Sequence, residues 1–194
     1  MMQKGQSKMS NIQTAMNGAR ASGYVEVSEA PAIGMITMRG DLADAAVQKA
    51  ITSVMGSGVP ATLAVTDADA GQILWMSPDE LLIVCAYDQA EQMVVDLTAS
   101  LGDTHSMVVN VSDARVVFDL DGAATPEIIA KLAPIDVKAM QAGTVRRTRF
   151  AQIPAAFWMT SKDSARIICF RSVAEYMFNQ LRNSAQKGFE VGDW

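Results

Sequence analysis

The sequence contains few of the side chains that enzymes and metalloproteins place at their reacting centres. It has one histidine, His105, and two cysteines, Cys85 and Cys169, which lie far apart along its 194 residues. A structural zinc site needs more ligands at closer spacing, and a cysteine nucleophile needs a histidine as its base. We therefore expect no metal ligands and no catalytic residues among these three side chains.

Several motifs of common enzyme classes are also missing. The sequence contains no G-x-G-x-x-G loop, no P-loop, no H-E-x-x-H and no G-x-S-x-G. These motifs support dinucleotide binding, nucleotide hydrolysis, zinc proteolysis and α/β-hydrolase chemistry respectively. The paired aspartates at 67 and 69, and at 119 and 121, stand beside glycine or alanine, which is typical of turns. We expect no cofactor-binding residues from local motifs.

Long apolar runs and an excess of positive charge are absent as well. The longest apolar run, 81–87, has the length of a strand, and the first 24 residues lack the apolar segment of a secretory signal. We therefore expect a soluble, cytoplasmic protein. The net charge of −5 argues against nucleic acid as the main partner. A chain of this length buries roughly 70% of its unfolded surface, enough for one large or two small domains.

An internal repeat is the main feature that the chain does contain. The stretch LWMSPDELLIVCAYDQAEQMVVDL (74–97) resembles FWMTSKDSARIICFRSVAEYMFNQL (157–181) when one residue is inserted after the turn. Residues 83–85 then align with 167–169, so Cys85 and Cys169 occupy matching apolar runs and are predicted to be buried in strands. Trp75 and Trp158 are predicted at matching packing positions; a pair of ligand platforms is the alternative.

The first half of the chain reads as β-α-β-β-α-β. A strand at 33–38 precedes a helix at 40–56, for which we expect Asp41 as the N-cap and Gly56 as the stop. Pro78 and Asp79 predict a hairpin between strands 72–77 and 80–86. The next helix is predicted to begin at Asp88, which with Glu91 is close to a capping box, and to end before Gly102. A strand at 106–111 closes this half.

The second half repeats the pattern. We expect a strand at 114–120, then a helix at 125–132 capped by Thr125 with Pro126 in its first turn. Strands at 146–160 and 165–170 form the second hairpin. The last helix is predicted to begin with a capping box at Ser172 and Glu175 and to run to Gly188.

The predicted fold class is α+β. Two tandem β-α-β-β-α units, with mainly antiparallel sheets packed on helices, should be related by a pseudo-two-fold internal repeat. The expected organisation is a flexible N-terminal arm at 1–30, a first repeat at 31–111 and a second repeat at 112–194, packed together as one compact body. The arm is polar and has little periodicity, which is typical of a segment that becomes ordered on a partner.

Two groups of charged residues could take part in binding. Asp113 and Arg115 lie at the junction of the halves, where we expect an ion pair that orients them; an anion or carboxylate site is the alternative. Three arginines fall within 146–149. On a strand, Arg147 and Arg149 share one face and Arg146 points away. This pattern indicates a solvated edge or a surface that meets a partner, with a phosphate site as the alternative.

Four segments together resemble the gamma subunit of heterotetrameric sarcosine oxidase. They are LWMSPDELLIV (74–84), VSDARVVFDLDGAATPEIIAKLAPIDV (111–137), GTVRRTRFAQIPAAFW (143–158) and RSVAEYMFNQLRNSAQKGFEVG (171–192). The resemblance implies a complex with alpha, beta and delta chains that oxidatively demethylates sarcosine or a related N-methyl amino acid. It also implies FAD, covalently attached FMN, NAD and tetrahydrofolate on the other chains. The gamma chain is similar in fold to the folate-binding domain of aminomethyltransferases and carries no recognised cofactor.

Two hypotheses of different classes follow. The first is a non-catalytic structural subunit that meets the largest, alpha, chain through a methionine-rich face and the N-terminal arm. The second is a stand-alone module that binds a folate or an amino acid between the repeats, with Arg115 or the arginines at 146–149 holding a carboxylate. The K-G-C-Y-x-G-Q-E motif of related folate-binding iron–sulfur repair proteins is absent, so no folate-binding residue is assigned by resemblance.

Overall fold

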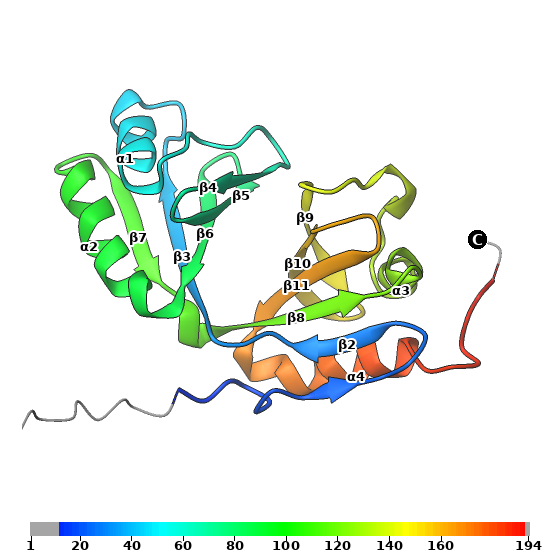
Figure 1. Cartoon of the computed structure of the whole chain (residues 1–194). Helices are drawn as coiled ribbons and strands as arrows, with labels where there is room; N and C mark the ends of the chain where they lie inside the picture. The colour runs from blue at the N-terminus through cyan, green and yellow to red at the C-terminus, as the bar shows by residue number, and fades with distance from the viewer. Residues whose placement is uncertain (1–11, 193–194) are drawn as a thin grey trace, which may run out of the picture.

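The chain folds into two antiparallel sheets that pack face to face, and each sheet carries two helices on its outer face (Figure 1). The computed structural model describes residues 12–192. The five-stranded sheet has the order β4-β5-β6-β3-β7, and the six-stranded sheet has the order β1-β2-β8-β11-β10-β9. The α+β class predicted from the sequence is confirmed.

The first repeat supplies the whole five-stranded sheet. Its elements are β3 (Ile33–Gly40), α1 (Ala45–Met55), β4 (Val65–Ala68), β5 (Gly71–Ser77), β6 (Glu80–Ala86), α2 (Ala90–Leu101) and β7 (Ser106–Asn110). Helices α1 and α2 cover one face of the sheet, where apolar residues of both helices and of β3, β5 and β6 form a buried cluster. Strand β4 is an element that the sequence reading did not include.

The second repeat supplies most of the six-stranded sheet. Its elements are β8 (Arg115–Asp121), α3 (Thr125–Leu132), β9 (Val145–Phe150), β10 (Ile153–Met159), β11 (Ser164–Phe170) and α4 (Ala174–Ser184). The single strand expected at 146–160 is therefore two strands, joined by a turn in which Ala151 has a left-handed φ of 51°. Helices α3 and α4 cover the outer face and share a second buried cluster with it.

The same strand order occurs in both sheets, so the repeat extends to the topology. Ile83 of β6 lies opposite Ile36 of β3, and Ile167 of β11 lies opposite Phe118 of β8. β4, β5, β6 and β3 thus correspond to β9, β10, β11 and β8. The strand beside β3 and β8 has a different origin in the two sheets: β7 follows α2 in the five-stranded sheet, whereas β2 (Glu26–Glu29), from near the N-terminus, takes this place in the other sheet.

The N-terminal segment is part of the fold, which corrects the expectation of a flexible arm over 1–30. Strand β2 pairs with β8, and the short β1 (Arg20–Ala21) pairs with β2. Val25 and Val27 are each only 1% exposed. The alternation of these valines with polar residues is the period of a strand, but it is too short to stand out in a polar segment. Residues 1–11 of the predicted arm lie outside the described part.

A buried carboxylate holds the preceding residues in place. Glu29, at the end of β2, accepts hydrogen bonds from Oγ1 of Thr14 at 2.7 Å, from N of Met16 at 2.9 Å and from N of Gly18 at 2.7 Å. A buried carboxylate needs several donors to offset its lost hydration. The loop before β1 provides these donors, and residues 12–18 therefore fold back over β2.

None of the four predicted capping residues caps its helix in the structure. Helix α1 is capped by Asp44, whose side chain accepts from N of Ala46, and Asp41 instead accepts from N of Ala43 in the preceding turn. Asp88 and Ser172 lie in 3₁₀ turns, η1 (Tyr87–Gln89) and η4 (Arg171–Val173), and neither side chain caps the helix that follows. The 3₁₀ turn itself is repeated in both halves.

The fourth helix start and the helix ends give a mixed outcome. Pro126 lies in the first turn of α3 as expected, but Thr125 does not cap it, and its hydroxyl is buried without a hydrogen-bond partner within residues 12–192. Gly56 has a φ of 76° and ends α1 as predicted, and Gly102 follows the last residue of α2. Helix α4 ends at Ser184, before the predicted Gly188.

The two sheets meet through a third buried cluster made only of residues from strands and their connections. Its buried members are Ala30, Met35, Leu74, Leu82, Val84, Val117, Val145, Ala156, Trp158 and Ile168. Trp158 is the largest of them and is 1% exposed. The four-layer packing therefore depends on this apolar contact between the repeats.

The two tryptophans do not occupy matching positions. Trp158 lies opposite Arg166 and belongs to the cluster between the sheets, whereas Trp75 lies opposite Leu81 and packs, half-buried, on the helix side of its sheet. The structural equivalent of Trp158 is Leu74. Since neighbouring strand residues point to opposite faces, the one-residue insertion in the hairpin moves tryptophan from one face to the other. The prediction that each tryptophan is a packing residue is confirmed; the prediction that they match is wrong.

Candidate functional site

A cleft opens between the two sheets where the apolar cluster ends. It encloses about 400 Å³. The five-stranded sheet contributes Thr37 and Glu80, and the six-stranded sheet contributes Arg115, Arg147, Arg149 and Phe170. Each of these residues faces the cleft because it alternates with residues that point toward the helices. The cleft thus gathers three guanidinium groups and one carboxylate from two sheets.

Arg115 is the most enclosed of the three arginines. Its guanidinium carbon lies 4.1 Å from the centroid of the Phe170 ring, and its Nε is buried without a hydrogen-bond partner within residues 12–192. Burial lowers the pKa of the guanidinium, and the negative charge of Glu80 opposes this effect. An arginine keeps its charge at neutral pH even so. Arg115 therefore carries a positive charge and an unused donor beside the cleft.

Arg147 and Arg149 line the cleft from β9, and the prediction that they share one strand face is confirmed. They lie opposite Ala156 and Pro154, which also line the cleft. Nη1 of Arg147 reaches across to Glu80 of the five-stranded sheet at 3.0 Å, and this ion pair bridges the two repeats. Nη2 of Arg149 donates to the carbonyl oxygen of Gln152. The cleft keeps an excess of positive charge, which suits a ligand with a carboxylate.

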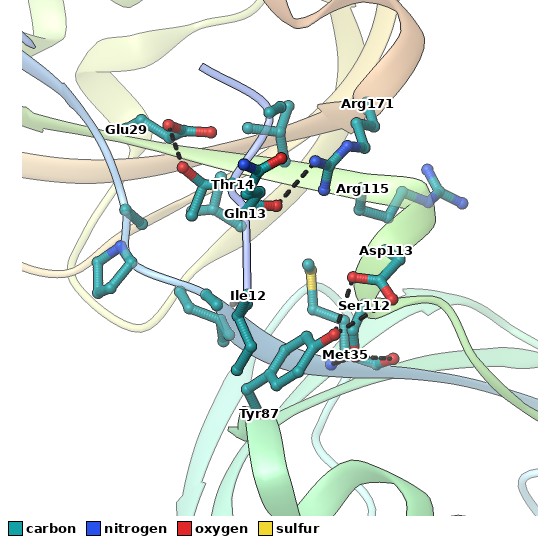
Figure 2. Close-up of a pocket in the computed structure, with 17 residues that line it drawn as sticks. Ile12, Gln13, Thr14, Glu29, Met35, Tyr87, Ser112, Asp113, Arg115 and Arg171 are labelled. Atoms are coloured by element: carbon teal, nitrogen blue, oxygen red, sulfur yellow. Dashed lines mark hydrogen bonds between the residues drawn. The ribbon is translucent and has the colours of Figure 1, made fainter. Parts of the chain in front are cut away.

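The predicted ion pair between Asp113 and Arg115 does not form. Asp113 instead accepts hydrogen bonds from the hydroxyl of Tyr87, at 3.0 and 3.1 Å to its two oxygens, and Figure 2 shows Arg115 pointing away from it. This hydrogen bond raises the pKa of Tyr87. Asp113 and Arg115 are two residues apart but point in different directions, because Asp113 lies in a 3₁₀ turn, η2 (Ser112–Ala114), and Arg115 is the first residue of strand β8.

A second hollow lies at this junction and is filled by the N-terminal segment (Figure 2). Nη2 of Arg171 donates to the carbonyl oxygen of Gln13 at 2.8 Å. The remaining space is about 30 Å³, enough for a few water molecules at most. This hollow is a packing site between the repeats and the N-terminal segment, and it has no room for a small-molecule ligand.

Both cysteines are buried strand residues, as predicted. They lie at matching positions on the helix side of β6 and β11. Burial raises the pKa of Cys85, and it raises the pKa of Cys169 to about 12. A thiol with a raised pKa is protonated at neutral pH and is a poor nucleophile. Within residues 12–192, no group of three or more His, Cys, Asp and Glu side chains is placed to hold a metal ion.

A polar cluster near the C-terminus has a structural role. Oε1 of the buried Glu127 accepts from the hydroxyl of Tyr24 at 2.9 Å, from Nζ of Lys131 at 2.9 Å and from N of Val191 at 2.8 Å. Burial raises the pKa of Glu127, but these hydrogen bonds outweigh it and the net direction is downward. The cluster ties α3 to both ends of the described chain.

Within residues 12–192, no helix is long and apolar enough to cross a membrane.

Sequence reasoning identified the arginines of the cleft but missed Glu80 and Phe170. Glu80 begins a strand and gives no local sign that it meets an arginine 67 residues later. Phe170 ends an apolar strand run, and its 47% exposed ring is visible as unusual only once the strand faces are known. Contacts across the repeat are decided by tertiary packing, so no local pattern records them.

Comparison with known proteins gives consistent results. The model of the sarcosine oxidase gamma subunit family matches residues 39–187. Curated gamma subunits of sarcosine oxidase from Corynebacterium sp. strain P-1 and strain U-96 are 28% and 29% identical. The alignments cover 90% and 84% of this chain, and 87% and 79% of those proteins.

Solved structures show the same likeness in fold. A chain of the heterotetrameric sarcosine oxidase from Corynebacterium sp. U-96, in complex with pyrrole 2-carboxylate, has a TM-score of 0.78 at 24% identity, with 90% of this chain and 91% of that chain covered. Aminomethyltransferase T of the glycine cleavage system from Bartonella henselae has a TM-score of 0.65 at 11% identity, with 82% of this chain and 45% of that chain covered. The expected likeness to an aminomethyltransferase fold is confirmed.

Proposed function

Because the chain belongs to the sarcosine oxidase gamma subunit family, we propose that it is a structural, non-catalytic subunit of a cytoplasmic heterotetramer that oxidatively demethylates sarcosine or a related N-methyl amino acid. The alpha, beta and delta chains bind FAD, FMN, NAD and tetrahydrofolate, which accepts the one-carbon unit. The gamma chain makes its main contact with the alpha chain. The observation that carries this proposal is the family match, which spans parts of both repeats.

The chemistry of the described residues supports a structural role. An apolar cluster without any charged residue lies between the sheets. The cleft beside it is lined by arginines, whose guanidinium groups bind anions but do not act as general bases at neutral pH. Glu80 is the one carboxylate among the residues that line the cleft, and it forms an ion pair with Arg147. The raised pKa values of both thiols keep them protonated.

Co-purification tests this function directly. We expect the full-length chain, co-expressed with alpha, beta and delta chains of the same host, to elute in one flavin-containing complex that oxidises sarcosine. Omission of this chain should lower the yield of the assembled complex, because a structural subunit acts by stabilising the assembly. Size-exclusion chromatography with flavin absorbance gives the measurement. Elution of this chain alone, with the other three assembled and fully active, would contradict the proposal.

A second candidate function is the binding of a folate or an amino acid in the cleft. The observation that favours it is the convergence of Arg115, Arg147 and Arg149 on one cleft with an unused donor on Arg115. A carboxylate of the ligand would accept from Arg115, and a flat ring system or an apolar side chain would lie against Phe170. Arg115 would then act as a binding residue and would transfer no proton.

The second candidate predicts a specific loss of binding. In titration calorimetry with tetrahydrofolate and with sarcosine, Arg115→Met should weaken the affinity about 10- to 100-fold, since a charge-assisted hydrogen bond contributes roughly 1.5–3 kcal/mol. The control is Arg146→Met, which removes the same charge from a residue of β9 that does not line the cleft. Absence of saturable binding at millimolar ligand, or an equal loss in both variants, would remove this candidate.

A further inference from the structure

The outer edges of the two sheets differ, although the repeats place equivalent strands there. In the six-stranded sheet, β1 pairs with the outer edge of β2, with Arg20 opposite Ser28 and Ala21 opposite Val27. In the five-stranded sheet, β7 takes the equivalent position, and no strand within residues 12–192 pairs with its outer edge. An unpaired edge exposes a row of backbone donors and acceptors that can pair with another chain.

On the face that points toward the other sheet, the side chains of β7 are apolar, whereas those of β2 are polar. Val109 and Met107 of β7 are 42% and 43% exposed. Their equivalents in β2 are the polar residues Ser28 and Glu26. The strand registers establish this equivalence. In the five-stranded sheet, Val109 lies opposite Thr37 and Met107 lies opposite Arg39. In the six-stranded sheet, Ser28 lies opposite Asp119 and Glu26 lies opposite Asp121. The chain therefore carries apolar residues at the uncovered edge and polar residues at the covered one.

Helix α2 adds an exposed apolar side chain on the opposite, helix-covered face of this edge. Nδ2 of Asn110, at the end of β7, donates to Oε1 of Glu91 at 2.8 Å, so this stripe of α2 lies beside β7. Val95 is one turn further along the same stripe and is 58% exposed. Val95, Met107 and Val109, which we call the β7 edge patch, combine exposed apolar side chains with unpaired strand backbone.

We propose that β7 is the docking edge for an extended segment of a partner subunit, which pairs with it as an additional strand and covers the β7 edge patch. This inference rests on the proposed role of the chain as a subunit. The internal repeat supports the mode of binding, because β1 covers the equivalent strand in the same way. Strand addition combines backbone hydrogen bonds with apolar contacts from alternate side chains, and the β7 edge patch offers both.

Other occupants fit less well. The sequence of residues 1–11 contains no β-branched and no aromatic residue, which are the residue types that favour strands. The family is named for subunits of a multi-chain enzyme, so a different chain is a better occupant than a second copy of this one. The segment should carry apolar residues at alternate positions to contact Met107 and Val109.

The test exchanges the side chains of one edge for those of the other. The double variant Met107→Glu and Val109→Ser gives β7 the residues found at the equivalent positions of β2. In the complex co-expressed with the alpha, beta and delta chains and purified through a tag on alpha, we expect at least about tenfold less of the double variant than of the wild-type chain. Thermal unfolding of the variant chain should be unchanged, because both side chains are exposed.

A charge control and a backbone measurement complete the experiment. Tyr176→Glu adds a negative charge at another exposed side chain, on α4 and 40% exposed, and should leave incorporation unchanged. Amide hydrogen exchange in residues 106–110 should slow at least about tenfold in the complex relative to the free chain, because pairing protects backbone amides.

The outcomes separate this inference from the proposed function. Wild-type incorporation together with equal incorporation of the double variant, or with unchanged exchange at 106–110, would overturn the docking edge and leave the subunit role intact. An equal loss in Tyr176→Glu would assign the effect to charge and would also overturn it. Failure of the wild-type chain to join the complex would overturn both. Because β7 already pairs with β3, only its amides that point away from β3 report on the open edge. Protection of those amides already in the free chain would assign the edge to an occupant within this chain.

Discussion

Replacement of Trp158 by alanine is expected to lower the free energy of unfolding by about 3–5 kcal/mol, the range for a large aromatic side chain removed from a core. Trp158 is 1% exposed and is the largest residue between the sheets. Trp75→Ala should cost roughly 1–2 kcal/mol, because this ring is only half-buried and loses less apolar contact. Urea denaturation of both variants, followed by fluorescence and circular dichroism, gives the comparison.

A conservative variant sharpens this prediction. Nε1 of Trp158 is buried and has no hydrogen-bond partner within residues 12–192. Trp158→Phe keeps an aromatic ring and removes the unpaired N–H, so its cost should be less than about 1.5 kcal/mol. Equal losses for Trp75→Ala and Trp158→Ala would contradict the structure, because they would indicate that the two tryptophans occupy equivalent environments.

Val27→Asp should destabilise the fold by roughly 3–5 kcal/mol, because it leaves an uncompensated charge in the core between β2, β8 and the helices. The matched control is Val109→Asp on β7, the strand at the equivalent place in the other sheet. Val109 is 42% exposed, so this change should alter stability by less than about 0.5 kcal/mol. The measurement is again urea denaturation of the isolated chain.

This pair of variants decides between two interpretations of the N-terminal segment. If residues 12–30 were a flexible arm, Val27 would be in water and both substitutions would have small effects. A large loss for Val27→Asp alone indicates that β2 is an integral strand of the six-stranded sheet. A stability of Val27→Asp within about 0.5 kcal/mol of the wild type would contradict the pairing of β2 with β8.

Elements with strong periodicity were predicted well. The hairpin around Pro78 and Asp79 and the strand at 165–170 lie where they were predicted, because apolar runs of strand length between turn residues favour strands. The burial of both cysteines followed from the same pattern. Element starts were predicted less well: Asp88 and Ser172 fit the capping pattern, yet each lies in a 3₁₀ turn, because a short polar signal is compatible with several turn geometries.

The candidate site could be predicted only in part. The alternation of Arg147 and Arg149 on one strand face followed from the strand period alone. Their meeting with Glu80 and Arg115 did not, because these residues come from strands that are distant in sequence and are joined only by the packing of one sheet on the other. The ion pair predicted between Asp113 and Arg115 failed for a local reason, since Asp113 lies in a 3₁₀ turn and Arg115 begins a strand.

The sequence by itself determined the α+β class, the duplication and the family, because these depend on residue patterns that survive within each repeat. Only the tertiary structure decided which tryptophan holds the sheets together, which strand completes the second sheet and which edge stays open. The physical reason is that a one-residue shift reverses the face of a strand residue, and that pairing between distant strands depends on the whole fold.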